Sequence, residues 1–250
     1  MCLIAFEWQP DSERPLVLAA NRDEFHARPT RALHWWRWPG GPLAGSDEQA
    51  GGTWLAAARD GRFAAITNFR DPGAAGGRRS RGELPVAWIE SAEPAGQFAA
   101  AVHDRRGEYA PFNLLFGTGE AVWIVGTHAA PQAVSPGVHA LSNHLLDTPW
   151  PKSIRAVRRM QRWAAGAEAD VDGLLDLLDD RQPAPPEELP DTGVGPALES
   201  MLSAPFIVAD RYGTRSSTAL VMGATIHMAE RCFDASGAAV GERVFTWRRC

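Results

Sequence analysis

The sequence is poor in several features that would narrow its function at once. It has three cysteines and a single lysine, Lys152, among 250 residues. Its longest apolar run falls well short of the roughly 20 residues that a membrane-spanning helix needs. Cys2, Cys232 and Cys250 form no CxxC pair and cannot all pair with one another. We therefore expect no disulfide framework, no thiolate zinc site and no membrane span.

Other absences concern location and partners. The N-terminus lacks the basic stretch and cleavage site of a secretory signal, which predicts a cytoplasmic protein. With 25 Lys+Arg against 30 Asp+Glu the net charge is −5, so nothing indicates a nucleic-acid partner. The dominance of arginine over lysine suggests a GC-rich bacterial genome.

The remaining composition is that of a folded protein, with 45% hydrophobic residues. No repeat or linker interrupts residues 1–250, which predicts one domain. Apolar runs and turn signals predict strands at 2–8, 16–20, 53–58, 62–67, 113–117, 121–125, 138–142, 206–209, 218–222, 225–230 and 243–247. Helical periodicity predicts helices at 86–92, 95–105, 153–165 and 171–180, the last after an Asp170 N-cap. Hairpins alternating with helix pairs favour an α+β layered fold on antiparallel sheets.

Position 2 carries a reactive side chain. Removal of Met1 would leave Cys2 with a thiol and a free α-amine, and the amine could then act as base for the nucleophile beside it. Such a nucleophile should have a lowered thiol pKa. The alternative is that Cys2 is a small buried residue that begins a strand, and retention of Met1 would exclude it as an N-terminal nucleophile.

A cluster of polar residues follows the second predicted strand, at Asn21 to Glu24. A solvated turn is the ordinary interpretation. If this strand pairs with the N-terminal strand, however, Asp23 could hold the α-ammonium of Cys2 and Arg22 could favour its thiolate.

Motifs throughout the chain resemble the NRDE family, whose eukaryotic members are the transport-and-Golgi-organization proteins. These motifs are MCLIAF at the start, NRDEF (21–25), GGTWLA (51–56), ITNFRDP (66–72), SRG (80–82), LSN (141–143), PWPK (149–152) and YGTRSST (212–218). The family is similar in turn to N-terminal-nucleophile hydrolases of the penicillin V acylase and bile-salt hydrolase kind. The resemblance implies a four-layer αββα sandwich.

The resemblance also implies a set of catalytic residues: Cys2, Asp23, Asn68, Asn143 and Arg215. Asn68 and Asn143 would supply amide donors to a developing oxyanion. Arg215 would pair with Asp23 or bind an anionic group of the substrate. Arg22 departs from the acylase spacing, because it is adjacent to Asp23 and neighbouring strand residues point to opposite faces.

Some other residues are candidates for binding. Trp35 and Trp36 could line an apolar cleft or simply pack at the edge of the domain. The histidines show no metal-site spacing, so we expect no metal and no cofactor, although His34 or His144 could ligate haem. The basic stretch Gly76 to Arg81 could hold a phosphate such as that of coenzyme A, or be a solvated loop.

These residues predict hydrolysis of a small amide or related acyl substrate through an acyl-thioester on Cys2. The alternative is a non-catalytic carrier or chaperone for haem or an acylated lipid or acyl-CoA, which would use the same cleft and the tryptophan-rich segment.

Overall fold

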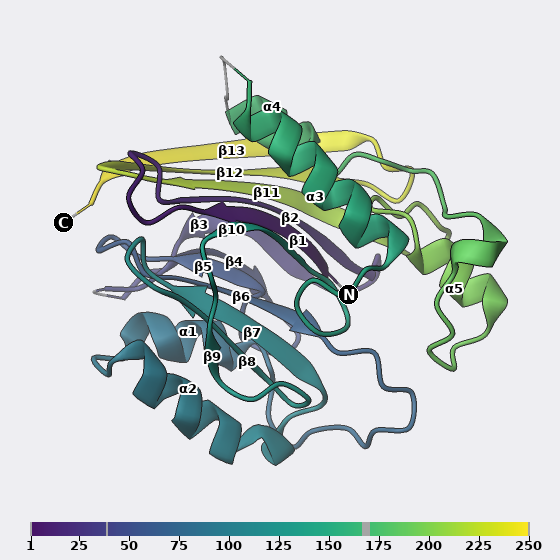
Figure 1. Ribbon diagram of the computed structural model, residues 1–250, viewed down its shortest axis with the longest axis horizontal. Coiled ribbons are helices and arrows are strands. Elements are labelled where there is room, and N and C mark those ends of the chain that lie inside the picture. Colours follow the sequence, from purple (N-terminus) through teal and green to yellow (C-terminus); the bar gives the residue numbers. More distant parts are fainter. Residues whose placement is uncertain (1, 39, 167–170, 250) are drawn as a thin grey trace.

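Two antiparallel sheets stacked face to face form the centre of the molecule, and helices cover both outer faces. A computed structural model describes residues 2–38, 40–166 and 171–249. Figure 1 shows the layers in the order helix, sheet, sheet, helix. This arrangement confirms the α+β layered fold expected from the sequence.

The first sheet contains the N-terminal strand in its interior. Within the described ranges its order is β10-β1-β2-β11-β12-β13. The bounds are β1 (Cys2–Trp8), β2 (Leu16–Phe25), β10 (Gly137–Leu141), β11 (Tyr212–Met222), β12 (Thr225–Phe233) and β13 (Ala239–Arg248). Because β1 pairs with β2 on one side and β10 on the other, the start of the chain is held inside the sheet.

The second sheet is built mostly from consecutive strands, in the order β3-β4-β5-β6-β7-β8-β9 among the described residues. Its strands are β3 (Thr30–Trp35), β4 (Leu43–Asp47), β5 (Leu55–Ala57), β6 (Phe63–Asn68), β7 (Phe112–Gly117), β8 (Val122–Gly126) and β9 (Gln132–Ala133). The predicted Asp60-Gly61 hairpin joins β5 to β6, and Gly61 has a φ of 88°, which glycine adopts without strain.

Alternating side chains of β1 divide the core into two parts. Ile4 and Phe6 face the second sheet and belong to the larger cluster between the sheets. Leu3 and Ala5 face the opposite way and pack with residues of the covering helices, such as Met160. A strand with both faces buried reads as a continuous apolar run, which is why CLIAF shows no alternation in the sequence.

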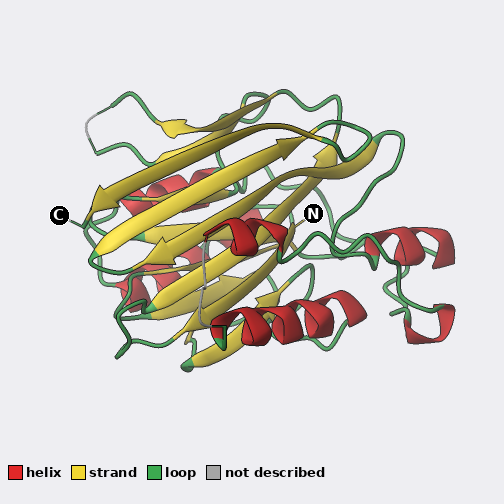
Figure 2. Ribbon diagram, turned by 90° about the horizontal axis from the view of Figure 1, so that it is seen from above, coloured by secondary structure: helices red, strands yellow, loops and turns green. Residues whose placement is uncertain are grey.

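The helices lie in pairs on the outer faces. α3 (Pro151–Ala164) and α4 (Val171–Asp176) cover the first sheet, and Figure 2 shows them lying over its strands. α1 (Glu83–Glu90) and α2 (Ala95–Asp104) cover the second sheet. α5 (Pro196–Leu202) lies beyond the strand ends, and short 3-10 turns occupy 106–108 and 186–188.

Several boundaries differ from the sequence-based prediction. β2 runs through Asn21 to Phe25 instead of stopping at Ala20, because its backbone pairs with β1 as far as Arg22 and with β11 as far as Phe25. β3 and β4 were not predicted, and 206–209 makes only an isolated bridge through Val208. The expected N-cap Asp170 lies outside the described residues.

Candidate active site

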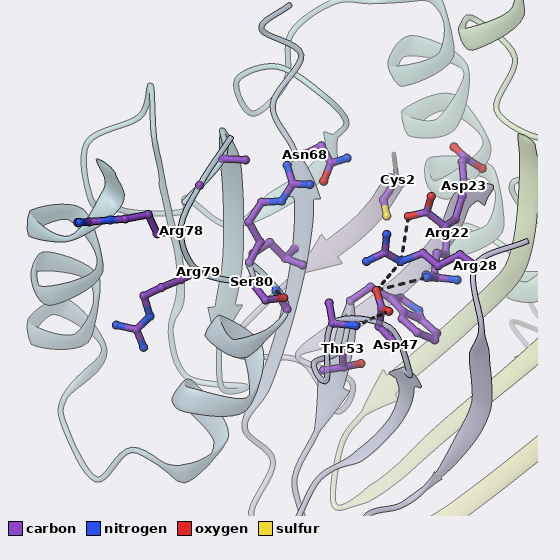
Figure 3. A pocket seen from close by; sticks show the side chains of 18 residues that line it. Cys2, Arg22, Asp23, Arg28, Asp47, Thr53, Asn68, Arg78, Arg79 and Ser80 are labelled. Atoms are coloured by element: carbon purple, nitrogen blue, oxygen red, sulfur yellow. Dashed lines mark hydrogen bonds and ion pairs between the residues drawn. The ribbon is translucent and has the colours of Figure 1, made fainter. Parts of the chain in front are cut away.

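A pocket of about 390 Å³ opens at the N-terminal end of β1. Its lining includes four of the predicted residues, Cys2, Arg22, Asp23 and Asn68. Figure 3 shows these side chains on one side of the pocket and the loop that carries Ser80 on the other. Strands from both sheets therefore contribute to one cavity around the Cys2 sulfur.

Cys2 is the first residue of β1 and is paired with Arg22 on β2. Burial raises the pKa of its thiol, the nearby Asp23 carboxylate raises it further, and the Arg22 guanidinium opposes them. The expectation of a lowered thiol pKa is therefore wrong for the chain that retains Met1. The α-amine that would act on this thiol exists only after Met1 has been removed.

Asp23 lies on β2 with 2% of its surface exposed. Its Oδ1 accepts a hydrogen bond of 2.7 Å from the Thr214 hydroxyl. Burial raises the pKa of this carboxyl, while the positive charge of Lys152 and the bond from Thr214 lower it. A carboxylate kept from water in this way favours a cation as its neighbour.

Arg22 is 5% exposed and is held from three directions. Its Nη1 donates to the Thr30 hydroxyl at 3.0 Å, and its Nη2 lies 3.9 Å from Asp47 Oδ2. The guanidinium stacks over Trp54 at 4.2 Å from the ring centroid. Although Arg22 and Asp23 are adjacent on a strand, both line the pocket.

Asn68 and Asn143 lie at the ends of strands from different sheets. Asn68 ends β6 and lines the pocket. Asn143 follows β10, is fully buried and is not part of the pocket lining. The Asn143 Nδ2 donates to the Asn68 carbonyl at 3.0 Å. The neighbouring Ser142 hydroxyl donates to the Cys2 carbonyl at 3.5 Å, so this junction adjoins the N-terminal strand.

Lys152 is a functional candidate that the sequence reasoning did not assign. Only 2% of it is exposed, and its Nζ donates to Asn143 Oδ1 at 3.3 Å. Burial lowers its pKa to about 8, against the opposing charges of Asp23 and Cys2. The available signal was its position as the sole lysine, in the PWPK motif at the start of α3.

Arg215 occupies an irregularity in the first sheet and does not line the pocket. The pairing of β11 with β2 shifts between Thr214 and Ser216, so that Arg215 is an extra, bulged residue. Its Nη1 donates to the carbonyls of Phe25, His26 and Arg28. Arg215 thus fixes the turn after β2 through these backbone carbonyls, and Asp23 is not among its hydrogen-bond partners.

Trp35 and Trp36 also lie outside the pocket lining. Trp35 packs edge-to-face on Trp247 at 5.2 Å, and the Trp36 indole donates to the Ala44 carbonyl at 3.2 Å. These contacts are those expected if the two side chains pack at the edge of the domain. The tryptophan of the pocket is Trp54, from the GGTWLA motif.

The basic stretch after Gly76 forms a wall of the pocket, which residues 77–82 line. Two glycines hold this wall in place: a Cβ on Gly52 would collide with the backbone of Gly82. The Thr53 amide donates to the Gly82 carbonyl at 3.0 Å. The GGT and SRG motifs are therefore in direct backbone contact.

The described ranges hold no group of three or more His, Cys, Asp or Glu side chains placed to bind a metal ion. In the same ranges, no helix has both the length and the apolar character required to cross a bilayer.

Comparisons with known proteins agree with this architecture. The sequence model of the family Transport and Golgi organisation 2 matches residues 1–234. The chain is 31% identical over 255 residues to the human Transport and Golgi organization protein 2 homolog and 32% identical over 263 residues to the bovine one, in each case covering 91% of both chains. Among solved structures it is similar to a Caenorhabditis elegans N-acylethanolamine-hydrolyzing acid amidase ortholog, with a TM-score of 0.53 at 9% identity, over 88% of this chain and 92% of that one. The fold is therefore the αββα sandwich of N-terminal-nucleophile hydrolases.

Proposed function

The chain belongs to the Transport and Golgi organisation 2 family, and for this member we propose hydrolysis of a small amide or related acyl substrate by an N-terminal cysteine. The observation that carries the proposal is the pocket in which Cys2, from the start of β1, adjoins Asp23 and Asn68. An exposed strand terminus would not need a buried carboxylate, whereas an α-ammonium inside a pocket would.

The proposed reaction begins with removal of Met1. The α-amine of Cys2 takes the thiol proton, and the thiolate attacks the substrate carbonyl carbon. The tetrahedral intermediate collapses when the C–N bond breaks and the leaving amine takes the proton from the α-ammonium. Water then attacks the carbonyl carbon of the acyl-thioester. The C–S bond breaks, which releases the acid and regenerates the Cys2 thiol.

The surrounding residues would have distinct parts in these steps. Asp23 orients the α-ammonium, and Asn68 and Asn143 supply amide hydrogens toward the oxyanion. The amide of Asn143 has two N–H groups, of which one bonds to the Asn68 carbonyl, and the other would have to donate to the oxyanion. Arg22 would contact the substrate, and Arg215 would act as a positioning residue through the turn that it holds.

We prefer hydrolysis to a carrier function for haem or an acylated ligand. The carrier hypothesis relied on Trp35 and Trp36 in the same cleft as Cys2, and both pack elsewhere. The pocket is bordered mainly by charged and polar side chains, which suit a small polar substrate better than a porphyrin.

A matched pair of cysteine variants tests the proposal. The processed protein is assayed against a panel of N-acyl amides, and free amine is measured. Cys2→Ala should reduce turnover of any responsive amide by at least about 1,000-fold, because the nucleophile is removed. Cys232→Ala should retain it, since burial raises the pKa of Cys232 to about 12 and keeps it protonated. Equal turnover by the wild type and Cys2→Ala would contradict the proposal.

A further inference from the structure

In the described part of the chain, two arginines of the pocket wall opposite Cys2, Arg78 and Arg81, have no carboxylate partner, and Arg81 is the half-buried one. Arg81 lies in the SRG motif and lines the pocket. Its Nη1 donates to the neutral carbonyl of Pro111 at 2.9 Å, and this is its side-chain hydrogen bond in the structure. Its side chain is half-buried, so its charge is only partly hydrated.

The other arginines around the pocket are neutralised or directed elsewhere. Arg28 lies 2.7 Å from Asp47 Oδ2, which also neighbours Arg22 at 3.9 Å. Arg79 pairs with Glu83 and Glu108 outside the pocket. Figure 3 shows the side chains of Arg78 and Arg79 pointing away from the Cys2 sulfur. Arg81 is therefore the arginine of this loop whose positive charge is available to bind an anion inside the pocket.

Arg81 also lies within electrostatic reach of the candidate nucleophile. Burial lowers the pKa of its guanidinium, and the largest opposing effect is the negative charge that Cys2 carries when ionised, ahead of that of Glu24. The backbone contact between Gly52 and Gly82 fixes the residue next to Arg81, and the Leu84 amide donates to the Arg81 carbonyl at 3.1 Å. A guanidinium held in this way is a preorganised anion-binding group.

We propose that Arg81 forms an anion subsite that selects substrates carrying a carboxylate or phosphate group close to the bond that Cys2 attacks. That the bound anion is part of a substrate rests on the proposed hydrolase function. Binding of an anion by Arg81 does not itself require catalysis. A half-buried cation attracts an anionic ligand more strongly than an exposed cation does, because less water screens the two charges. The planar fork of arginine suits both oxyanions.

Binding of small probes to a chain without the thiol tests this subsite. In the Cys2→Ala background, isothermal titration at low salt measures the affinities of glutarate, inorganic phosphate and the neutral glutaramide. We expect at least one of the two anions to bind about tenfold or more tightly than glutaramide, and the tighter anion identifies the chemical source. Arg81→Gln in that background should lose about tenfold in affinity for it. Arg78→Gln, at an exposed position of the same loop, should stay within about twofold.

Arg81→Lys serves as a second variant that keeps the charge, and it should retain the preference for the anion over glutaramide. If Arg81→Gln does not fold, the ratio of anion to glutaramide affinity in the parent still decides, because equal affinities overturn the proposal. Absence of binding by both anions, or equal binding by the parent and a folded Arg81→Gln, also overturns it. If anion binding requires Arg81 but no amide is hydrolysed by the wild type, the hydrolase proposal fails and the subsite stands.

Discussion

The side-chain amide of Asn143 donates a hydrogen bond of 3.0 Å to the backbone carbonyl of Asn68, and this bond joins the ends of two strands from different sheets. The Oδ1 of the same amide accepts from Lys152 at 3.3 Å. One fully buried amide thus connects the first sheet, the second sheet and the start of α3 beside Cys2.

Processing of the N-terminus should change the chemistry of Cys2. We expect the mature chain to begin at Cys2, with an intact mass lower by one methionine. In an N-terminally extended chain, burial holds the pKa of the thiol above its ordinary value, so alkylation by iodoacetamide should need higher pH. In the processed chain the adjacent α-ammonium should move the profile to lower pH. The measurement is the rate of labelling against pH in a Cys232→Ala background, and coincident profiles would refute this prediction.

Lys152 should make stability depend on pH above neutrality. Its pKa falls from 10.5 to about 8 on folding, so between these values the unfolded chain binds more protons and stability rises with pH. The free energy of unfolding of the parent minus that of Lys152→Met should increase by up to about 3 kcal/mol across this window. Urea titrations at several pH values, in a Cys2→Ala background that removes the thiol titration, measure the difference. A difference that is flat from pH 8 to 10 would be inconsistent with a buried cationic lysine.

Gly52 should tolerate no side chain. In Gly52→Ala the new Cβ would collide with the Gly82 backbone, which must move the wall carrying Arg81. We expect a loss of about 1–3 kcal/mol in the free energy of unfolding and faster tryptic cleavage after Arg78 to Arg81. Gly76→Ala is the matched control, because its Cβ would meet nothing within 4 Å. Equal cleavage rates for the two variants would count against a fixed wall.

The ion pair between Arg70 and Glu199 should contribute to stability from inside the protein. The two side chains are 5% and 4% exposed, and Nη1 lies 2.6 Å from Oε2. The Arg70 amide also donates to the Asn143 carbonyl at 2.7 Å, which links α5 to the site. Glu199→Gln leaves a buried guanidinium without this carboxylate and should cost about 3 kcal/mol or more in urea unfolding. Glu187→Gln, at an exposed position, should be neutral.

Local patterns predicted most of the strands, because apolar runs and turn residues determine them over short distances. The Asp60-Gly61 hairpin and the buried β1 are examples. β3 and β4 escaped prediction because a tryptophan-rich, glycine- and proline-containing segment has no clear alternation. Their strand form comes from pairing with each other and with β5, which is information that a local window lacks.

The candidate site was accessible from the sequence only in part. The gathering of Cys2, Asp23 and Asn68 followed from the resemblance to acylases, and the pocket brings them together. Lys152 was missed because lysine side chains are almost always exposed, so nothing local indicated that this one is buried. Arg215 was expected at the pocket, but its role depends on a bulge that composition does not reveal.

That bulge decides which chemical group stands opposite Asp23. With the extra residue, the cross-strand neighbour of Asp23 is Thr214, which donates a neutral hydroxyl. Without the bulge but with Arg215 still present, the register that pairs Arg22 with Ser216 would continue and place the Arg215 guanidinium opposite the Asp23 carboxylate. Deletion of Thr214 alone would have this effect, and it would leave length, hydropathy and strand propensity almost unchanged. A homologue with that deletion would still align over its whole length, and yet an arginine would compete for the carboxylate that we propose binds the Cys2 amino group.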